Sequence, residues 1–213
     1  MNIFDKHILP DRKGFESDPF GYSALAWHKW GMAQTIAGFP VNVAQPPTSK
    51  DLKSPILWLT QAHAMSEAAC IVIQNEPDLT HLPILVKGVC DSQYCAVGLM
   101  LVGYSLEICL KAMLIMKKGV DIYTTEEKQH KHHRLERLAE FVPDLSVKDK
   151  AILQTLTYFV TWAGRYPDPG LGREAESEQI FSLSERHQVA AKDLFQLSAR
   201  VMAYSRQVAN RNT

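Results

Sequence analysis

Residues 92–119 read SQYCAVGLMLVGYSLEICLKAMLIMKKG, and this stretch decides the fold class. Its apolar positions recur at the spacing of one helix face, which predicts a long buried helix over residues 92–118 that stops before Gly119. The charges in its middle, Glu107 and Lys111, lie one turn apart with the acid first, the order that stabilises a helix. Because both charges are costly in lipid, we expect the core helix of a bundle and no membrane partner.

Other segments with helical periodicity flank this stretch, and no credible strand or hairpin pattern is found. Ser54 followed by Pro55 is a favoured helix start, and Ser146 with Asp149 forms a capping pattern. The predicted helices cover residues 54–75, 124–142 and 146–163, with a polar loop after Gly164 and a last helix from Ser182, capped with Glu185. We therefore expect an all-α protein in which residues 54–213 form an antiparallel bundle of four to five helices, with 54–75 as a central helix.

The first 53 residues differ from the rest, since aromatic side chains alternate there with prolines. Only residues 23–37 have a helical pattern, with Gly38 as its stop. Disordered segments are poor in aromatic residues, so we expect an N-terminal extension that packs on the bundle. A polar, proline-containing linker over residues 45–49 ends this extension.

The overall charge is balanced, with 23 basic and 23 acidic residues, so no global field attracts nucleic acid or an anionic membrane. Two segments are locally basic, residues 111–137 and residues 186–213. Such patches either bind phosphates or form ordinary solvated helix faces. The first residues lack the order of a secretory signal and the cysteines lack disulfide-like spacing, so we expect a cytoplasmic protein.

Histidines gather at His130, His132 and His133, on the predicted helix 124–142. His130 and His133 have chelating spacing, but the further ligands of a closed metal site are not in view, and basic neighbours repel a cation. We interpret the cluster as a solvated helix surface. His63 and Glu67 are interpreted as a hydrogen-bonded pair between helices. We expect no metal and no cofactor.

The loop after the predicted helix 146–163 contains Arg165 and Tyr166. The guanidinium of Arg165 can cap helix carbonyls or reach across the bundle to a carboxylate such as Glu107. Sequence patterns for a serine nucleophile, a phosphate-binding loop or a dinucleotide site are absent. Cys109 lies among apolar residues and is expected to be inert core.

The segment GYSLEICLKAML at 103–114, a helix that ends at glycine, and HRLERL at 133–138 together resemble the HEPN superfamily. The resemblance covers about residues 54–210. It implies a homodimeric helical bundle, and in many members a metal-independent ribonuclease that uses an Arg-x(4–6)-His motif. No arginine of this chain is followed by histidine at that spacing, so the resemblance implies a bundle without the standard site.

We therefore expect a non-catalytic HEPN-like binding module with RNA or protein as partner. One alternative is a diverged metal-independent ribonuclease of the same fold that uses Arg165 or Arg186 with His187, supported by Glu107. Another is a helical bundle that binds a small molecule or nucleotide in a pocket lined by the N-terminal aromatics. The candidate binding residues are Arg165, Tyr166, Lys111, Glu107, Arg134 and Arg186.

Overall fold

The structure is a computed structural model that describes residues 11–24, 26–39 and 41–211. The described residues are helices and connecting segments, without a strand among them, so the protein is all-α as expected. The chain divides into two compact units, Met1–Leu57 and Trp58–Thr213. The first ten residues, which include the segment tested for a secretory signal, lie outside the described residues.

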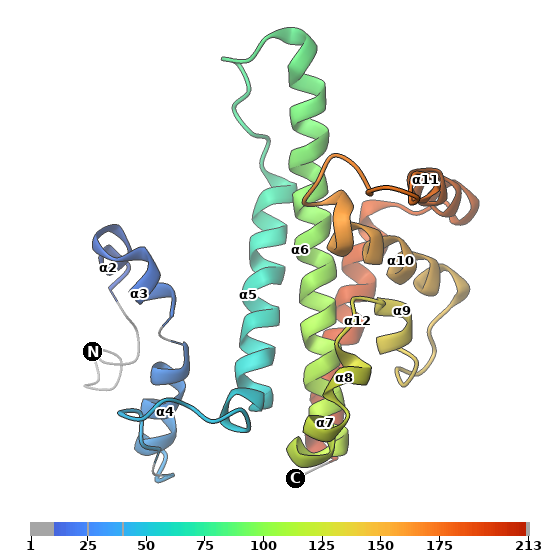
Figure 1. Cartoon of the computed structure of the whole chain (residues 1–213). Helices are drawn as coiled ribbons and strands as arrows, with labels where there is room; N and C mark the ends of the chain where they lie inside the picture. Colours follow the sequence, from blue (N-terminus) through green and yellow to red (C-terminus); the bar gives the residue numbers. More distant parts are fainter. Residues whose placement is uncertain (1–10, 25, 40, 212–213) are drawn as a thin grey trace. The chain divides into compact units, whose positions relative to one another are not determined.

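The first unit consists of short helices (Figure 1): α2 (Lys13–Ser17), α3 (Pro19–Ser23), α4 (Ala26–Ile36) and the 3₁₀ helix η1 (Asp51–Lys53). The side chain of Asp18 caps α3 by accepting a hydrogen bond from the amide of Gly21 at 2.9 Å. The predicted helix over 23–37 corresponds mainly to α4, and Gly38 adopts a φ of +91°, as a helix stop does. Packing of this unit on the bundle stays a prediction.

The second unit is organised around α6 (Ile84–Lys118), which begins at Ile84 and not at residue 92 as predicted. Pro83 occupies the N-cap position, and since proline readily precedes or begins a helix, the helix extends back to it. Gly119 ends the helix with a φ of +79°. The buried residues of α6 all lie between Gly98 and Ile115, so the C-terminal part of this helix forms the core.

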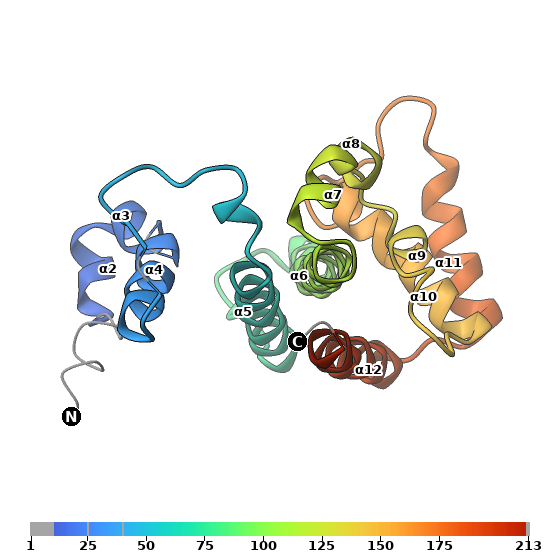
Figure 2. The ribbon, with the colours of Figure 1, turned by 90° about the horizontal axis from the view of Figure 1, so that it is seen from below.

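α6, and not α5 (Pro55–Gln74), is the central helix of the second unit, so the expectation for residues 54–75 is wrong. α6 packs against α7, α9, α10, η2 and α12, and Figure 2 shows α6 end-on with α5 on one side and α7, α9 and α10 on the other. Only Ala62 and Ala69 of α5 are buried. α5 contacts α6 where the hydroxyl of Ser105 donates to the carbonyl oxygen of Ala62 at 2.7 Å.

Two helices, α5 and α6, are long and apolar enough to cross a membrane. Core helices of soluble proteins pass the same test, and 61% of the most apolar window of α6 is buried inside the structure. The corresponding share for α5 is 11%. The expectation of no membrane partner stays a prediction.

The predicted helix over 124–142 is wrong, because the chain forms three short helices there: α7 (Val120–Thr125), α8 (Glu127–His130) and α9 (Leu135–Leu138). The hydroxyls of Thr124 and Thr125 donate back to the carbonyl oxygens of Val120 and Ile122 within α7. The break after His130 falls in the run of histidines and basic residues. His130 and His133 therefore do not share a helix.

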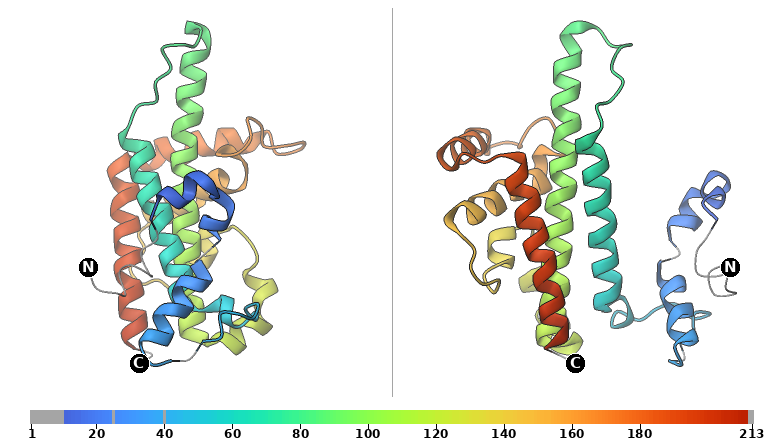
Figure 3. Two further views of the ribbon diagram at one scale, coloured as in Figure 1. Left: turned by 90° about the vertical axis from the view of Figure 1, so that its left-hand side faces the viewer. Right: turned by 180° about the vertical axis from the view of Figure 1, so that it is seen from behind.

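α10 (Val147–Tyr158) begins with the predicted capping box of Ser146 and Asp149 and continues into the π-helical turn η2 (Phe159–Ala163). The predicted end of this helical segment at Gly164 is confirmed. The predicted start of the last helix at Ser182 and the predicted polar loop are wrong, because α11 (Ala175–His187) occupies much of that loop and contains Ser182 and Glu185. The last helix, α12 (Ala191–Asn210), runs beside α6, as the right view of Figure 3 shows.

Candidate functional site

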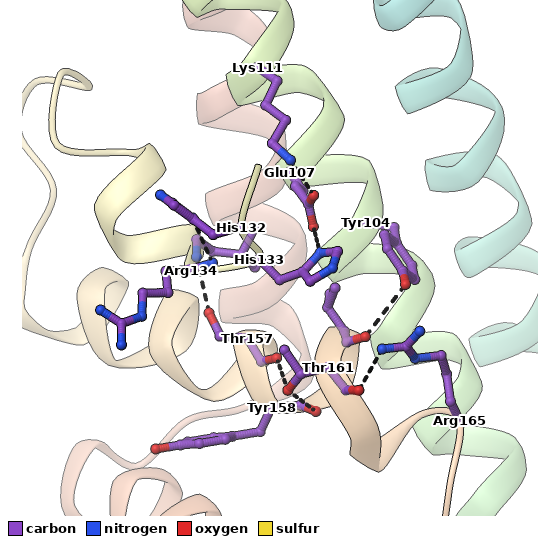
Figure 4. A network of polar contacts seen from close by, with 12 residues as sticks. Tyr104, Glu107, Lys111, His132, His133, Arg134, Thr157, Tyr158, Thr161 and Arg165 are labelled. Atoms are coloured by element: carbon purple, nitrogen blue, oxygen red, sulfur yellow. Dashed lines mark hydrogen bonds and ion pairs between the residues drawn. The ribbon is translucent and has the colours of Figure 1, made fainter. Parts of the chain in front are cut away.

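A buried carboxylate forms the centre of the candidate site. Glu107 is 4% exposed, and its two oxygens have different partners: Oε1 accepts from Nζ of Lys111 at 2.7 Å, and Oε2 contacts Nδ1 of His133 at 2.9 Å. Lys111 is one turn away on α6, whereas His133 comes from the segment between α8 and α9. Glu107 thus anchors that segment to the core helix (Figure 4).

The contact with Glu107 orients the imidazole of His133. An ionised carboxylate only accepts hydrogen bonds, so Nδ1 of His133 carries a proton and a neutral ring has its free lone pair on Nε2. The ring of Tyr104 packs edge-on against this imidazole, with centroids 6.1 Å apart. The side chain of His133 is 44% exposed, so an oriented imidazole is available to a ligand.

Beside His133 lies a polar cleft of about 580 Å³, which we call the α10 cleft. One wall is a face of α10 and η2 whose residues recur at helical spacing. The other walls come from the segment before α9, from α9 itself and from the start of α11. Its lining residues are His132, His133, Arg134, Glu136, Gln154, Thr157, Tyr158, Thr161, Arg173 and Glu176.

Hydrogen bonds fix the walls of the α10 cleft relative to one another. The hydroxyl of Thr157 accepts from the amide of Leu135 at 3.0 Å, which holds the start of α9 on α10. On the other side, Nε1 of Trp162 donates to Glu176 at 2.8 Å. Arg173 forms a two-pronged pair with the same carboxylate, at 2.7 and 2.8 Å.

The electrostatic balance of the cleft depends on its histidines. Burial lowers the pKa of His132, and the charges of Arg137, Lys111, His130 and Arg134 lower it further. His132 is therefore neutral at neutral pH. The guanidinium of Arg134 is exposed and forms no ion pair within the described residues, so it is available to an anion.

The π-helical turn η2 explains the position of Arg165. In this turn the amide of Gly164 bonds to the carbonyl of Phe159, five residues back, which changes the partners of the neighbouring carbonyls. Nη2 of Arg165 donates to the carbonyl oxygen of Thr161 at 2.5 Å, and the guanidinium lies 5.6 Å from the ring centroid of Tyr166. Figure 4 shows Arg165 at Thr161 and away from Glu107.

The candidate binding residues Arg165, Tyr166, Glu107 and Lys111 therefore form two separate pairs. Glu107 and Lys111 are paired, but the proposed reach of Arg165 to Glu107 is wrong, and His133 occupies that oxygen instead. The capping interpretation of Arg165 is confirmed.

Other predicted residues are placed outside the α10 cleft. Arg186 and His187 lie in the last turn of α11, so the expected position of His187 inside the last helix is wrong. In the basic segment 186–213, Arg200 pairs with Asp149, which reduces the free charge of that segment. His63 and Glu67 lie 3.9 Å apart on one helix and are both exposed, so they do not join two helices.

Sequence reasoning missed His133, Thr157 and Tyr158 as residues of one site. The signal for Thr157 and Tyr158 was present, because positions 154, 157, 158 and 161 repeat at helical spacing with polar side chains. The contact between His133 and Glu107 was not predicted, although the segments 103–114 and 133–138 that carry the resemblance contain both residues.

The described residues form no metal centre, and Cys109 lies in the core. No group of three or more histidine, cysteine, aspartate or glutamate side chains is placed to hold a metal ion there. Cys109 is buried, and burial raises the pKa of its thiol to about 11, which keeps it protonated as expected for inert core.

The chain matches no protein-family model, no curated protein and no solved structure.

Proposed function

We propose that this chain is a HEPN-like binding module, an antiparallel helical bundle whose α10 cleft binds the phosphate backbone of single-stranded RNA. The observation that carries the proposal is that the exposed side chain of Arg134 and the exposed, oriented imidazole of His133 both line one polar cleft. The guanidinium of arginine is a good phosphate ligand. The proposal includes a cytoplasmic homodimer, as the HEPN resemblance implies.

The surroundings of the cleft also favour RNA. The segment from Lys111 to Arg137, which supplies part of the cleft, has an excess of basic residues. The charged side chains that line the cleft itself are balanced, with Arg134 and Arg173 against Glu136 and Glu176. Tyr158 lines the cleft, and an aromatic ring beside cationic groups is a common way to hold an unstacked base. A single-stranded partner fits these features because its bases are accessible.

Fluorescence anisotropy with a short, labelled single-stranded RNA tests this function. We expect Arg134→Ala to weaken binding about fivefold and to reduce the salt dependence by about one phosphate contact. The matched control is Arg206→Ala, which removes an exposed arginine of α12 outside the cleft. Equal weakening by both substitutions, or no binding by the unaltered protein at low salt, would contradict the proposal.

A diverged ribonuclease is the second candidate, and the contact between Glu107 and His133 favours it. A general base for attack by a ribose 2′-hydroxyl must be an oriented group with a free lone pair, and Nε2 of His133 meets this requirement. In such a reaction Nε2 accepts the 2′-hydroxyl proton, the 2′-oxygen bonds to phosphorus, and the 5′-oxygen of the next nucleotide departs. This assignment replaces His187 with His133.

Incubation of labelled RNA with the protein in EDTA distinguishes the two candidates. Metal-independent cleavage that is lost in His133→Asn but kept in His187→Asn would support the ribonuclease. RNA binding without cleavage would support the binding module. Cleavage that persists in His133→Asn would exclude the role given to this histidine.

A further inference from the structure

A second hollow of the same unit is apolar and has a volume of about 250 Å³. It lies among α6, α10, η2, α11 and α12, outside the α10 cleft. Its walls are mainly apolar, and the larger side chains among them are Leu99, Ile152, Leu156, Phe159, Ile180 and Leu194. We call it the apolar pocket.

The chemistry of the lining restricts what the pocket can hold. No charged side chain lines it, and an unpaired charge is costly to bury in such a site. The hydroxyl of Thr155 already donates to the carbonyl of Ala151 at 2.9 Å. The hydroxyl of Ser184 is the remaining side-chain group able to donate or accept one hydrogen bond.

The pocket has an entrance at the connection between α11 and α12. Ala190 and Ala191 line the pocket and are exposed, so solvent reaches it beside two small side chains. The connection is held in place, since the amide of Val189 donates to the carbonyl of Ser184 at 3.0 Å. A more open hollow of about 520 Å³ shares Leu99, Phe159 and Ile180 with the pocket.

We propose that the apolar pocket binds a small, uncharged, mainly apolar molecule about the size of one fused aromatic ring system. An apolar cavity of roughly 150 Å³ in another protein stays dry and binds benzene, so the larger space here fits a larger ring. Ser184 gives such a ligand one polar contact, as is usual in sites that fix a mostly apolar molecule. This site is separate from the proposed RNA function and does not depend on it.

Titration of the full chain with indole, followed by methyl NMR, tests the pocket. We expect saturable shifts at Leu99, Ile152, Ile180 and Leu194. Ser184→Leu fills the pocket and should weaken indole binding about tenfold. Ser182→Leu is the matched control, because Ser182 is exposed on the same helix and does not line the pocket.

A second variant keeps the test decisive if Ser184→Leu disturbs the fold. Ala191→Phe narrows the entrance from an exposed position, and Ala199→Phe places the same side chain at an exposed position elsewhere on α12. Indole binding should weaken in the first and persist in the second. Shifts that stay linear up to the solubility of indole, or equal weakening in a variant and its control, would overturn the proposal.

Discussion

α10 and η2 form one continuous helical segment, and its two faces differ in the polarity of the residues that line them. Positions 154, 157, 158 and 161 line the polar α10 cleft, whereas positions 152, 155, 156 and 159 line the apolar pocket. The two sets are offset by two residues, which is about 200° around an α-helix. One short segment therefore separates a site suited to an anion from one suited to an uncharged ring.

The two faces are stabilised by different kinds of contact. The apolar face is stabilised by burial against α6, where Leu156 is 2% exposed. The polar face depends on hydrogen bonds to distant segments, such as that between Thr157 and the amide of Leu135. Substitutions on the two faces should accordingly change different properties.

The largest expected effect is on stability, from the apolar face. Leu156→Ala removes a buried side chain that contacts the core and should lower the free energy of unfolding by about 3 kcal/mol. Gln154→Ala, on the polar face, should change it by less than about 0.5 kcal/mol. Urea denaturation measures both, and similar losses would show that the two faces do not differ as described.

The second prediction concerns the anchor of the polar face. Glu107→Gln leaves the ammonium of Lys111, whose side chain is 12% exposed, without its counter-ion and should cost about 2 kcal/mol of stability. Adding Lys111→Met should recover part of this loss, because the second substitution removes the unpaired charge. A double variant less stable than Glu107→Gln alone would contradict the assigned pairing.

Much of this fold was predictable from local sequence. The capping box of Ser146 and Asp149, the stop at Gly119 and the buried stripe of α6 follow from neighbouring residues. The break of residues 124–142 into α7, α8 and α9 was not predictable, because it accompanies contacts of His133 with Glu107 and of Leu135 with Thr157. Contacts between distant residues leave no periodic pattern, and they also define the candidate site.

A smaller loss of stability is expected where α11 joins the cleft wall. Trp162→Phe keeps the aromatic packing but removes the hydrogen bond from Nε1 to Glu176. The free energy of unfolding should fall by about 1 kcal/mol. Hydrogen exchange of α11 amides should also become faster, whereas exchange in α6 should change little.

The smallest expected effect is on the pH dependence of RNA binding. The lowered pKa of His132 keeps it neutral at neutral pH, and it gains a charge as the pH falls through that lowered pKa, below its ordinary value of 6.5. RNA affinity should then rise a few-fold, while the contribution of His132 to stability, present above pH 6.5, is lost. His132→Asn should flatten the binding profile. His63→Asn, at an exposed position of α5, is the control.

The central claim is that the polar face of α10 and η2 is the RNA-binding face. Amide NMR of the labelled protein, titrated with a short single-stranded RNA, tests it most directly. We expect saturable chemical-shift changes at the amides of Gln154, Thr157, Tyr158 and Thr161, together with that of Arg134. Shifts confined to the opposite face or to α12, or no shifts at low salt, would contradict it.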